Sequence, residues 1–278
     1  MLTTVYPTLI TLLSSPLLKP LLPSDKDLLG FGRIQSIVKS HVSSRFTDTT
    51  TNNTNPSKTS PSPSPKPDML TSFITHGLSH SEAESEVIMQ FVAGSDTTAT
   101  AIRATLLYII TNPRILNTIH AELSSAGYTA TSPPPNKVIS SHDSVTHLPY
   151  IQATIKEGLR IHPPVPALTS KEVPPEGDIW KGVYLPPGTK VGVCMLGVMR
   201  DKNIWGEDAD EFKPERWIGV GEEKLKEMES TLNLVFSNGR WQCLGREIAV
   251  MELNKIFVEV GAGFVLGLLE KRLTTDCV

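Results

Sequence analysis

The sequence predicts a mainly α-helical fold with small antiparallel β-sheets. Long stretches carry apolar residues at helical spacing, and most of them begin or end at Pro, Gly or a capping residue. One stretch rich in Val, Pro and Gly, residues 166–199, alternates instead and is typical of short strands joined by tight turns. With 278 residues, the chain is long enough to bury a sizeable core.

Start and stop signals place the predicted helices. A capping box supports the start of the longest one, because a Ser at position 79 or 81 is followed three residues later by a Glu. Pro113 suits the first turn of the next helix, and Gly127 stops that helix. Helices are therefore expected over residues 33–46, 69–76, 79–112, 114–126, 148–161 and 246–260, with a single turn at 201–205.

The same reasoning places the strands. They are expected over residues 167–173, 182–185 and 190–198, with Pro186-Pro187-Gly188 as a turn. The apolar run at 232–236 also has a strand-like pattern. Residues 221–230, which precede it, are highly charged and predict a surface insertion.

Composition divides the chain into three parts. Residues 1–46 predict surface helices, and prolines interrupt residues 1–23 before they reach the ~20 apolar residues that a spanning helix needs. Residues 47–67 consist largely of Ser, Thr, Asn and Pro and hold no large apolar side chain, which predicts a disordered loop. Residues 68–278 are predicted to form the main ordered part.

Charge and cysteine content argue against several classes of protein. The 26 basic and 29 acidic residues give a net charge of −3, which does not indicate a nucleic-acid partner. The three cysteines, at positions 194, 243 and 277, are too few and too scattered for a disulfide framework or a cysteine-rich zinc site. A reducing, intracellular setting is the expectation.

One cysteine is distinguished by its surroundings, Phe236-Ser237-Asn238-Gly239-Arg240-Trp241-Gln242-Cys243-Leu244-Gly245. A cysteine just before a predicted helix can be a nucleophile, a small buried hydrophobe or a metal ligand held as thiolate. The helix N-terminus, the turn's N–H groups and Arg240 favour a thiolate, and Gly239 and Gly245 leave room for a flat cofactor. A thiolate is a known proximal ligand of haem iron.

The helix predicted over residues 79–112 has a polar interruption in its middle. Ala93-Gly94 and Asp96-Thr97-Thr98 separate two apolar runs. Small residues let a large ligand approach the backbone, and Ser or Thr inside a helix can open its hydrogen-bond ladder. The alternative explanation is a kink that faces solvent.

Two further motifs involve charge. Glu157 and Arg160 lie three residues apart on the helix at 148–161 and share a face, which by itself predicts an ordinary surface ion pair of little energetic weight. Further along the chain, residues 212–217 read Phe-Lys-Pro-Glu-Arg-Trp and include Arg216.

These four motifs, in this order and at these spacings, resemble the cytochrome P-450 family of haem-thiolate monooxygenases, and among them fungal members similar to pisatin demethylase. The resemblance covers residues 68 to about 264 and, more faintly, residues 1–46. It implies the cytochrome P-450 fold, truncated at its N-terminus so that only the C-terminal half is represented. Residues 68–278 are then the haem-binding part, and residues 1–46 form helices of the lid over the substrate pocket.

The resemblance also assigns roles. Cys243 is implied as the ligand of the haem iron, while Asp96 and Thr97 are implied to deliver protons to oxygen. The residues implied to bind the cofactor are Ala93, Gly94, Lys171, Phe236, Gly239, Arg240, Trp241 and Gly245. On local sequence alone, a strand lysine such as Lys171 is more often simply solvated.

A structural triad and one departure from the family pattern complete these assignments. Glu157, Arg160 and Arg216 are implied to form a buried, fully paired network that holds the haem-side loop. Trp241 stands where many relatives have an Arg or His that binds a propionate, with Arg240 one position earlier. An indole N–H can still donate a hydrogen bond, so haem is still expected.

The implied function is a haem-dependent monooxygenase that inserts one atom of O2 into an apolar organic substrate. Haem b is the expected cofactor, with electrons from NADPH through NADPH-cytochrome P-450 reductase, and fungal secondary metabolism is the expected setting. Two alternatives stay open: a truncated, inactive fragment, and a haem-thiolate enzyme with non-monooxygenase chemistry, against which Asp96 and Thr97 argue. The family's fungal members sit on the endoplasmic reticulum membrane, but this chain shows no evident anchor, which leaves both membrane-surface contact and a cytoplasmic location open.

Overall fold

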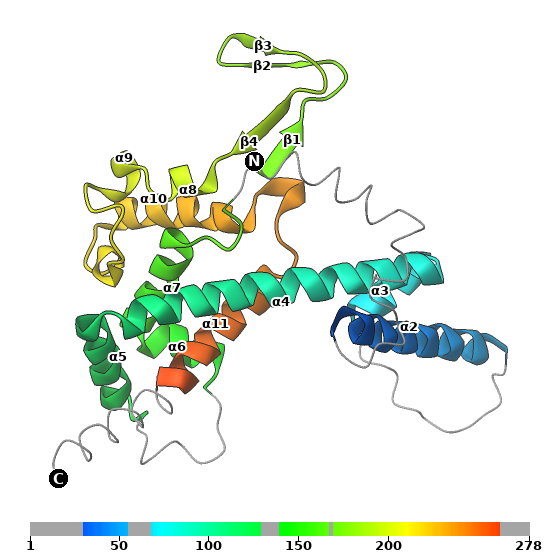
Figure 1. Cartoon of the computed structure of the whole chain (residues 1–278), viewed down its shortest axis with the longest axis horizontal. Helices are drawn as coiled ribbons and strands as arrows, with labels where there is room; N and C mark the ends of the chain where they lie inside the picture. Colours follow the sequence, from blue (N-terminus) through cyan, green and yellow to red (C-terminus); the bar gives the residue numbers. More distant parts are fainter. Residues whose placement is uncertain (1–29, 55–67, 129–138, 167–168, 262–278) are drawn as a thin grey trace. The chain divides into compact units, whose positions relative to one another are not determined.

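The computed structural model describes residues 30–54, 68–128, 139–166 and 169–261 (Figure 1). Some predictions fall outside the described residues, namely the parts of the predicted lid, loops and strands within residues 1–29, 55–67, 129–138, 167–168 and 262–278. The chain divides into two compact units, Met1–Ala93 and Gly94–Val278, and the division falls within the long helix α4 (His80–Ile110).

The first unit contains α2 (Gly30–Thr54), α3 (Met69–Thr75) and the start of α4. Its small core buries Val38, Val42 and Ala83. The capping box forms at Ser79, whose backbone N–H donates to Glu82 Oε2 at 2.8 Å, while the Glu82 N–H donates to Ser79 Oγ at 3.4 Å. α2 runs to Thr54, so the helix extends beyond residue 46, where the first predicted part of the chain ends. The disordered loop predicted over residues 47–67 stays a prediction.

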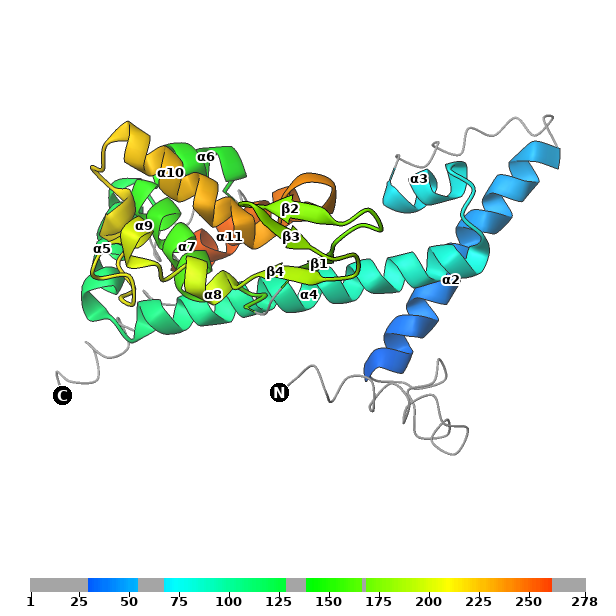
Figure 2. The same ribbon diagram turned by 90° about the horizontal axis from the view of Figure 1, so that it is seen from above.

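The second unit gathers its helices around α7 (Pro149–Ile161) (Figure 2). Pro149 begins α7, and the helix is buried on nearly every side because other elements pack against it all round. These elements are α5 (Pro113–Ser125), α6 (Ser141–His147), α10 (Glu222–Leu232), α11 (Arg246–Val260) and the 3-10 turn η2 (Pro214–Trp217). The shorter helical pieces are α8 (Met195–Val198), α9 (Lys202–Trp205), η3 (Asn233–Phe236) and η4 (Gly239–Trp241).

The β structure consists of two antiparallel pairs. β1 (Thr169–Glu172) pairs with β4 (Lys190–Val193), and β2 (Asp178–Trp180) pairs with β3 (Val183–Leu185) as a hairpin that projects beyond them (Figure 1). Lys181 and Gly182 turn the hairpin with φ of 49° and 80°, which is a two-residue turn with positive φ at both positions.

Several local predictions are wrong. The run at 232–236 is not a strand: Leu232 ends α10, and the next four residues form η3. Residues 221–230, predicted as a charged surface insertion, lie mostly at the surface but form the greater part of α10, which buries Met228 and Leu232, one turn apart on the same face. The strand expected over 190–198 ends at Val193, since Met195–Val198 is helical, and β2 was not expected. Short apolar runs fit helix and strand equally well, so packing decides between them.

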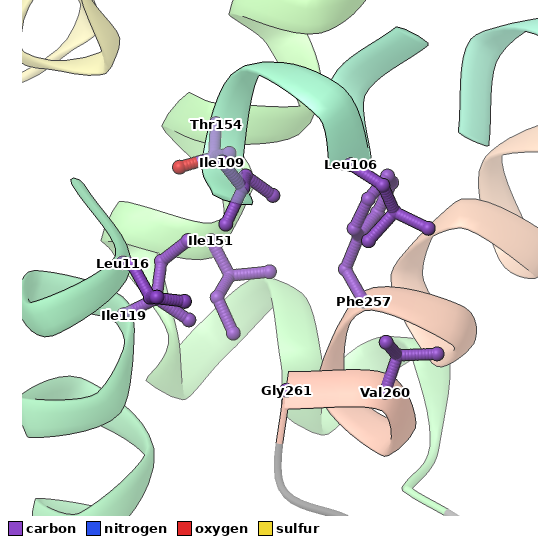
Figure 3. A pocket seen from close by; sticks show the side chains of 9 residues that line it. All are labelled: Leu106, Ile109, Leu116, Ile119, Ile151, Thr154, Phe257, Val260 and Gly261. Atoms are coloured by element: carbon purple, nitrogen blue, oxygen red, sulfur yellow. The ribbon is translucent and has the colours of Figure 1, made fainter. Parts of the chain in front are cut away.

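A small apolar cavity lies where four helices meet (Figure 3). Its volume is about 10 Å³, which is too small for an organic substrate. The lining residues come from α4, α5, α7 and the end of α11: Leu106, Ile109, Leu116, Ile119, Ile151, Thr154, Phe257, Val260 and Gly261. None of the helices within the described part of the chain combines the length and apolar character that crossing a bilayer requires.

Candidate cofactor site around Cys243

A closed loop presents Cys243 at the start of α11. The loop leaves η3 through Ser237, whose φ of 62° is unusual for a residue other than glycine, and turns again at Gly239 with the same φ. The Cys243 N–H donates to the Phe236 carbonyl oxygen at 2.8 Å and closes the loop. Gly245 is the N-cap of α11, so the thiol lies beside the positive end of that helix.

The thiol itself is free and exposed, and Gly245 leaves space beside it. A Cβ placed on Gly245 would lie 3.9 Å from Cys243 Sγ, and a Cβ on Gly239 would meet nothing within 4 Å. A side chain at position 245 would fill part of the space beside the sulfur, whereas Gly239 faces open space. Gly245 therefore helps to keep the sulfur accessible to a large ligand, as a metal-bound thiolate requires.

An apolar face adjoins the thiol. Leu244 is 87% exposed, and Ile248 and Met251 on α11 are exposed as well. Ile248 and Met251 are three positions apart and share one face of α11, while Leu244 precedes the helix and follows Cys243 directly in the chain. A flat apolar macrocycle bound through Cys243 would cover apolar surface that is otherwise in water.

Two cations gather on Trp241. Lys171 Nζ of β1 lies 4.3 Å from the centroid of the indole, and Arg240 Cζ lies 5.0 Å from it, both within cation–π range. Among the described residues neither cation forms an ion pair with a carboxylate. On local sequence alone Lys171 is more often simply solvated, but the structure brings it to the cysteine loop. Haem carries two propionates, so this chain's residues fit the group both in charge and in shape.

Arg246, which the sequence analysis did not single out, joins the cysteine loop to α11. Its guanidinium donates to Asn233 Oδ1 at 3.0 Å and to Glu247 Oε1 at 3.0 Å, and its Cζ lies 5.8 Å from the Phe236 ring. A basic residue directly after a helix N-cap glycine is unfavourable for the helix dipole, and this is the signal that marks it.

The three triad residues come together and are buried. Arg160 donates from Nε and Nη2 to the two oxygens of Glu157 at 2.9 and 2.8 Å, and Arg216 Nε donates to Glu157 Oε1 at 3.2 Å. The exposed fractions of the Glu157, Arg160 and Arg216 side chains are 0%, 0% and 5%. The alternative of a surface ion pair is therefore wrong.

Further groups complete the network. Trp217 Nε1 donates to Glu157 Oε2 at 2.9 Å, and Arg160 donates to three backbone carbonyls, those of Met199, Ala209 and Glu211. Arg216 also donates to Asp208 Oδ1 at 2.7 Å. Hydrogen bonds from Lys213 and Arg216 lower the pKa of Asp208 to about 2. The network fixes the segment of residues 199–217 on α7.

The residues predicted on α4 lie in an unbroken helix. Ala93 is the last residue of the first unit, while Gly94, Asp96 and Thr97 belong to the second. Asp96 is exposed and Thr97 is half-buried. A Cβ on Gly94 would meet nothing within 4 Å. The hydrogen bonds of the cysteine loop given above involve neither Asp96 nor Thr97, and their catalytic role stays a prediction.

An exposed thiol at a loop-to-helix junction, with an apolar face on one side and two cations on the other, defines a candidate haem-thiolate site. The family model of cytochrome P-450 matches residues 3–268. The chain therefore belongs to the cytochrome P-450 family.

Similar proteins agree with this assignment. Cytochrome P-450 monooxygenase ABA1 of Pyricularia oryzae is 40% identical over 247 residues, which are 89% of this chain and 45% of that protein. Cytochrome P-450 monooxygenase aba1 of Botryotinia fuckeliana is 36% identical over 265 residues, 95% of this chain and 49% of that protein. The chain thus spans about half the length of the curated relatives it matches.

A solved structure supports the fold. A crystal structure of a cytochrome P-450 superposes with a TM-score of 0.62 over 83% of this chain and 48% of that chain, at 23% sequence identity. This likeness, together with the mostly helical architecture and its small antiparallel sheets, confirms the predicted fold class.

Proposed function

We propose that the chain is the haem-binding part of a monooxygenase that inserts one atom of O2 into an apolar organic substrate. The observation that carries the proposal is the exposed, free Cys243 thiol in a hydrogen-bonded loop at the start of α11. The full activity belongs to a protein about twice as long in the relatives, so the substrate and partners are part of the proposal.

The chain's own residues divide the work of binding. Cys243 would hold the iron of haem b, and the loop from Phe236 to Gly245 would lie against the ring. Lys171 and Arg240, held at Trp241, would bind the propionates, and the small residues Ala93 and Gly94 would leave room for the cofactor at the α4 backbone. When bound, haem supplies the oxygen chemistry of the reaction.

Proton delivery is proposed for α4. Asp96 is exposed, and it would deliver protons toward the haem together with the hydroxyl of the neighbouring Thr97. Electrons would come from NADPH through NADPH-cytochrome P-450 reductase. The proposed setting is fungal secondary metabolism at the endoplasmic reticulum membrane, as for fungal members of the family.

The test is the carbon monoxide difference spectrum of the reduced, haem-supplemented 278-residue chain. The wild type is expected to show a red-shifted Soret band, and Cys243→Ala is expected to lose it. Cys194→Ala is the matched control, because Cys194 is also a free, exposed cysteine in the same unit, and it should leave the band unchanged. A soluble wild type with no band would reject the proposal in favour of an inactive fragment.

A further inference from the structure

The first unit brings together a serine, a histidine and a glutamate. Ser43 Oγ on α2 lies 3.0 Å from Nε2 of His80, the first residue of α4. Glu84 lies one turn further along α4, and its Oε1 is 3.5 Å from Nδ1 of the same imidazole. The ring therefore has a hydroxyl at one nitrogen and a carboxylate at the other. We call these three side chains the Ser43–His80–Glu84 relay.

The two contacts determine which nitrogen of the His80 ring carries the proton. Neutral imidazole has one N–H and one acceptor nitrogen. An ionised carboxylate accepts hydrogen bonds and does not donate them, so Glu84 favours the tautomer with its proton on Nδ1. Nε2 is then the acceptor, and the Ser43 hydroxyl donates to it. The hydroxyl thus has a base in place to take its proton when the oxygen attacks an electrophile.

The core of the first unit holds the relay in place. Val42, which precedes Ser43, and Ala83 on α4 are both 0% exposed and belong to that core. The Phe46 ring lies 5.1 Å from the His80 ring, within the range of aromatic contacts. Ser43 itself is exposed. Buried neighbours therefore fix the geometry, while a small molecule can reach the hydroxyl.

A second serine–histidine pair, on α3, has the opposite arrangement. Ser72 Oγ lies 3.4 Å from His76 Nδ1, but the same nitrogen lies 2.7 Å from the Ser72 carbonyl oxygen. A carbonyl oxygen only accepts hydrogen bonds, so Nδ1 of His76 carries a proton. This nitrogen therefore cannot take a proton from the Ser72 hydroxyl. The two pairs differ in the property that activates a serine.

We propose that Ser43 is a nucleophile that takes up acyl groups from small activated esters. In this reaction His80 is the base, and Glu84 is a positioning residue that fixes the tautomer and orientation of the imidazole. Because the relay lies at the surface, we expect it to act on esters whose alcohol leaves easily, such as aryl esters. The inference does not depend on haem binding.

The proposed reaction has two stages. Ser43 Oγ attacks the carbonyl carbon of the ester, and its proton passes to His80 Nε2. The bond between the carbonyl carbon and the leaving oxygen then breaks, and His80 gives the proton to that oxygen, which leaves an acyl-serine and a free alcohol. Water, with His80 again as the base, hydrolyses the acyl-serine to a carboxylic acid and restores the hydroxyl.

The test treats the whole 278-residue chain, without haem, with p-nitrophenyl acetate. The wild type is expected to release p-nitrophenol in an initial burst, and mass spectrometry should find an acetyl group on Ser43. Ser43→Ala should lose the burst, and His80→Gln should slow it by about 100-fold, as loss of a general base does. Ser72→Ala is the matched control, because Ser72 also contacts a histidine, and it should react like the wild type.

Glu84→Gln tests the positioning role separately. A glutamine side chain both donates and accepts, so it no longer fixes the tautomer of His80. Nitrogen chemical shifts in NMR are expected to show the proton on Nδ1 in the wild type and both tautomers in Glu84→Gln. Acetylation of Ser43 should slow by about tenfold, because the base is correctly protonated and oriented for less of the time. Glu86→Gln, at an exposed position of the same helix, should change neither measurement.

Three results would overturn the proposal. The first is a wild type in which Ser43 stays unmodified, and the second is equal acetylation of Ser43 and Ser72. The third is an unchanged rate of acetylation in His80→Gln, which would make Ser43 an ordinary surface hydroxyl. Circular dichroism of each variant checks that its helical content is unchanged.

Discussion

At the scale of single residues, Gly158 lets the backbone of α7 lie close against α4. A Cβ on this α7 glycine would lie 1.9 Å from Oγ1 and 2.8 Å from Cγ2 of Thr105 on α4. Thr105 is buried and β-branched, so its side chain has no room to move aside. We expect Gly158→Ala to lower the free energy of unfolding by about 1–3 kcal/mol, as overpacking does, measured by urea denaturation.

Gly94 provides the control for this prediction. It also lies within a helix, but a Cβ there would meet nothing within 4 Å, so Gly94→Ala should stabilise the chain by about 0.5–1 kcal/mol. If Gly158→Ala were as stable as Gly94→Ala, the close approach of α4 and α7 would be wrong. The two variants also distinguish the packing role of Gly158 from the proposed cofactor-binding role of Gly94, since only Gly94→Ala is expected to weaken haem binding.

At the scale of elements, Glu157 joins α7 to η2. It is fully buried and accepts hydrogen bonds from Arg160, Arg216 and Trp217. Glu157→Gln would leave two buried guanidinium groups without their shared counter-charge, so we expect a loss of about 3–5 kcal/mol in the free energy of unfolding. Guanidinium chloride screens charges, and urea is therefore the denaturant for this measurement.

An exposed pair serves as the comparison. Glu207 accepts from Lys202 Nζ at 2.8 Å, and its side chain is 90% exposed. Glu207→Gln should cost no more than about 1 kcal/mol, because water solvates both partners. If Glu157→Gln and Glu207→Gln lowered the free energy of unfolding by similar amounts, the burial and full pairing of Glu157 described above would be wrong.

The elements that the sequence predicted well are those with strong end signals. The helix expected over 246–260 has its observed bounds, because Gly245 and Gly261 mark both ends of a regular apolar pattern. Signals were weaker at 221–236, where a charged helix runs into an apolar 3-10 turn, and the apolar run was mistaken for a strand. The spacing of Leu225, Met228 and Leu232 does indicate one apolar face of a helix, and the density of charged residues around it concealed that pattern.

In the candidate site, too, local sequence signals predicted some contacts and missed others. The spacing of Glu157 and Arg160 predicts that they share a face, but Asp208 and Trp217 join them through folding of distant segments. The contact between Lys171 and Trp241 depends on where β1 lies relative to the cysteine loop, which no local signal encodes. Motifs therefore named the main residues, and the structure supplied the partners that hold them.

At the scale of the whole molecule, acid should weaken the fold partly through Asp208. Its pKa is lowered to about 2 by hydrogen bonds from Lys213 and Arg216, below the ordinary value near ~3.9. A lowered pKa of an acid gives stability that is present above the ordinary value and is lost as pH falls toward 2. Thermal unfolding between pH 5 and pH 2 should therefore show a smaller decline for Asp208→Asn than for the wild type. Parallel declines would contradict the assigned pairing.

Alkali should weaken the same unit through Tyr150. Burial, together with the hydrogen bond that its hydroxyl donates to Glu215 Oε1 at 2.8 Å, raises the pKa of Tyr150 to about 12. The neutral form is thus favoured in the folded state, so its contribution is complete below the ordinary pKa near ~10 and is lost as pH rises toward 12.

The variant Tyr150→Phe isolates this contribution. The pKa values of Lys213 and Tyr128 are also raised, and these two groups titrate in the same alkaline range, so the wild type alone does not identify the cause. Loss of the hydroxyl removes one hydrogen bond, and Tyr150→Phe should be less stable than the wild type at pH 7 by about 1 kcal/mol. Between pH 10 and 12 its stability should decline less than that of the wild type, in urea denaturation at each pH. Equal declines would mean that Tyr150 ionises as readily in the folded chain as in the unfolded one, and that its burial between α5 and η2 does not hold the proton.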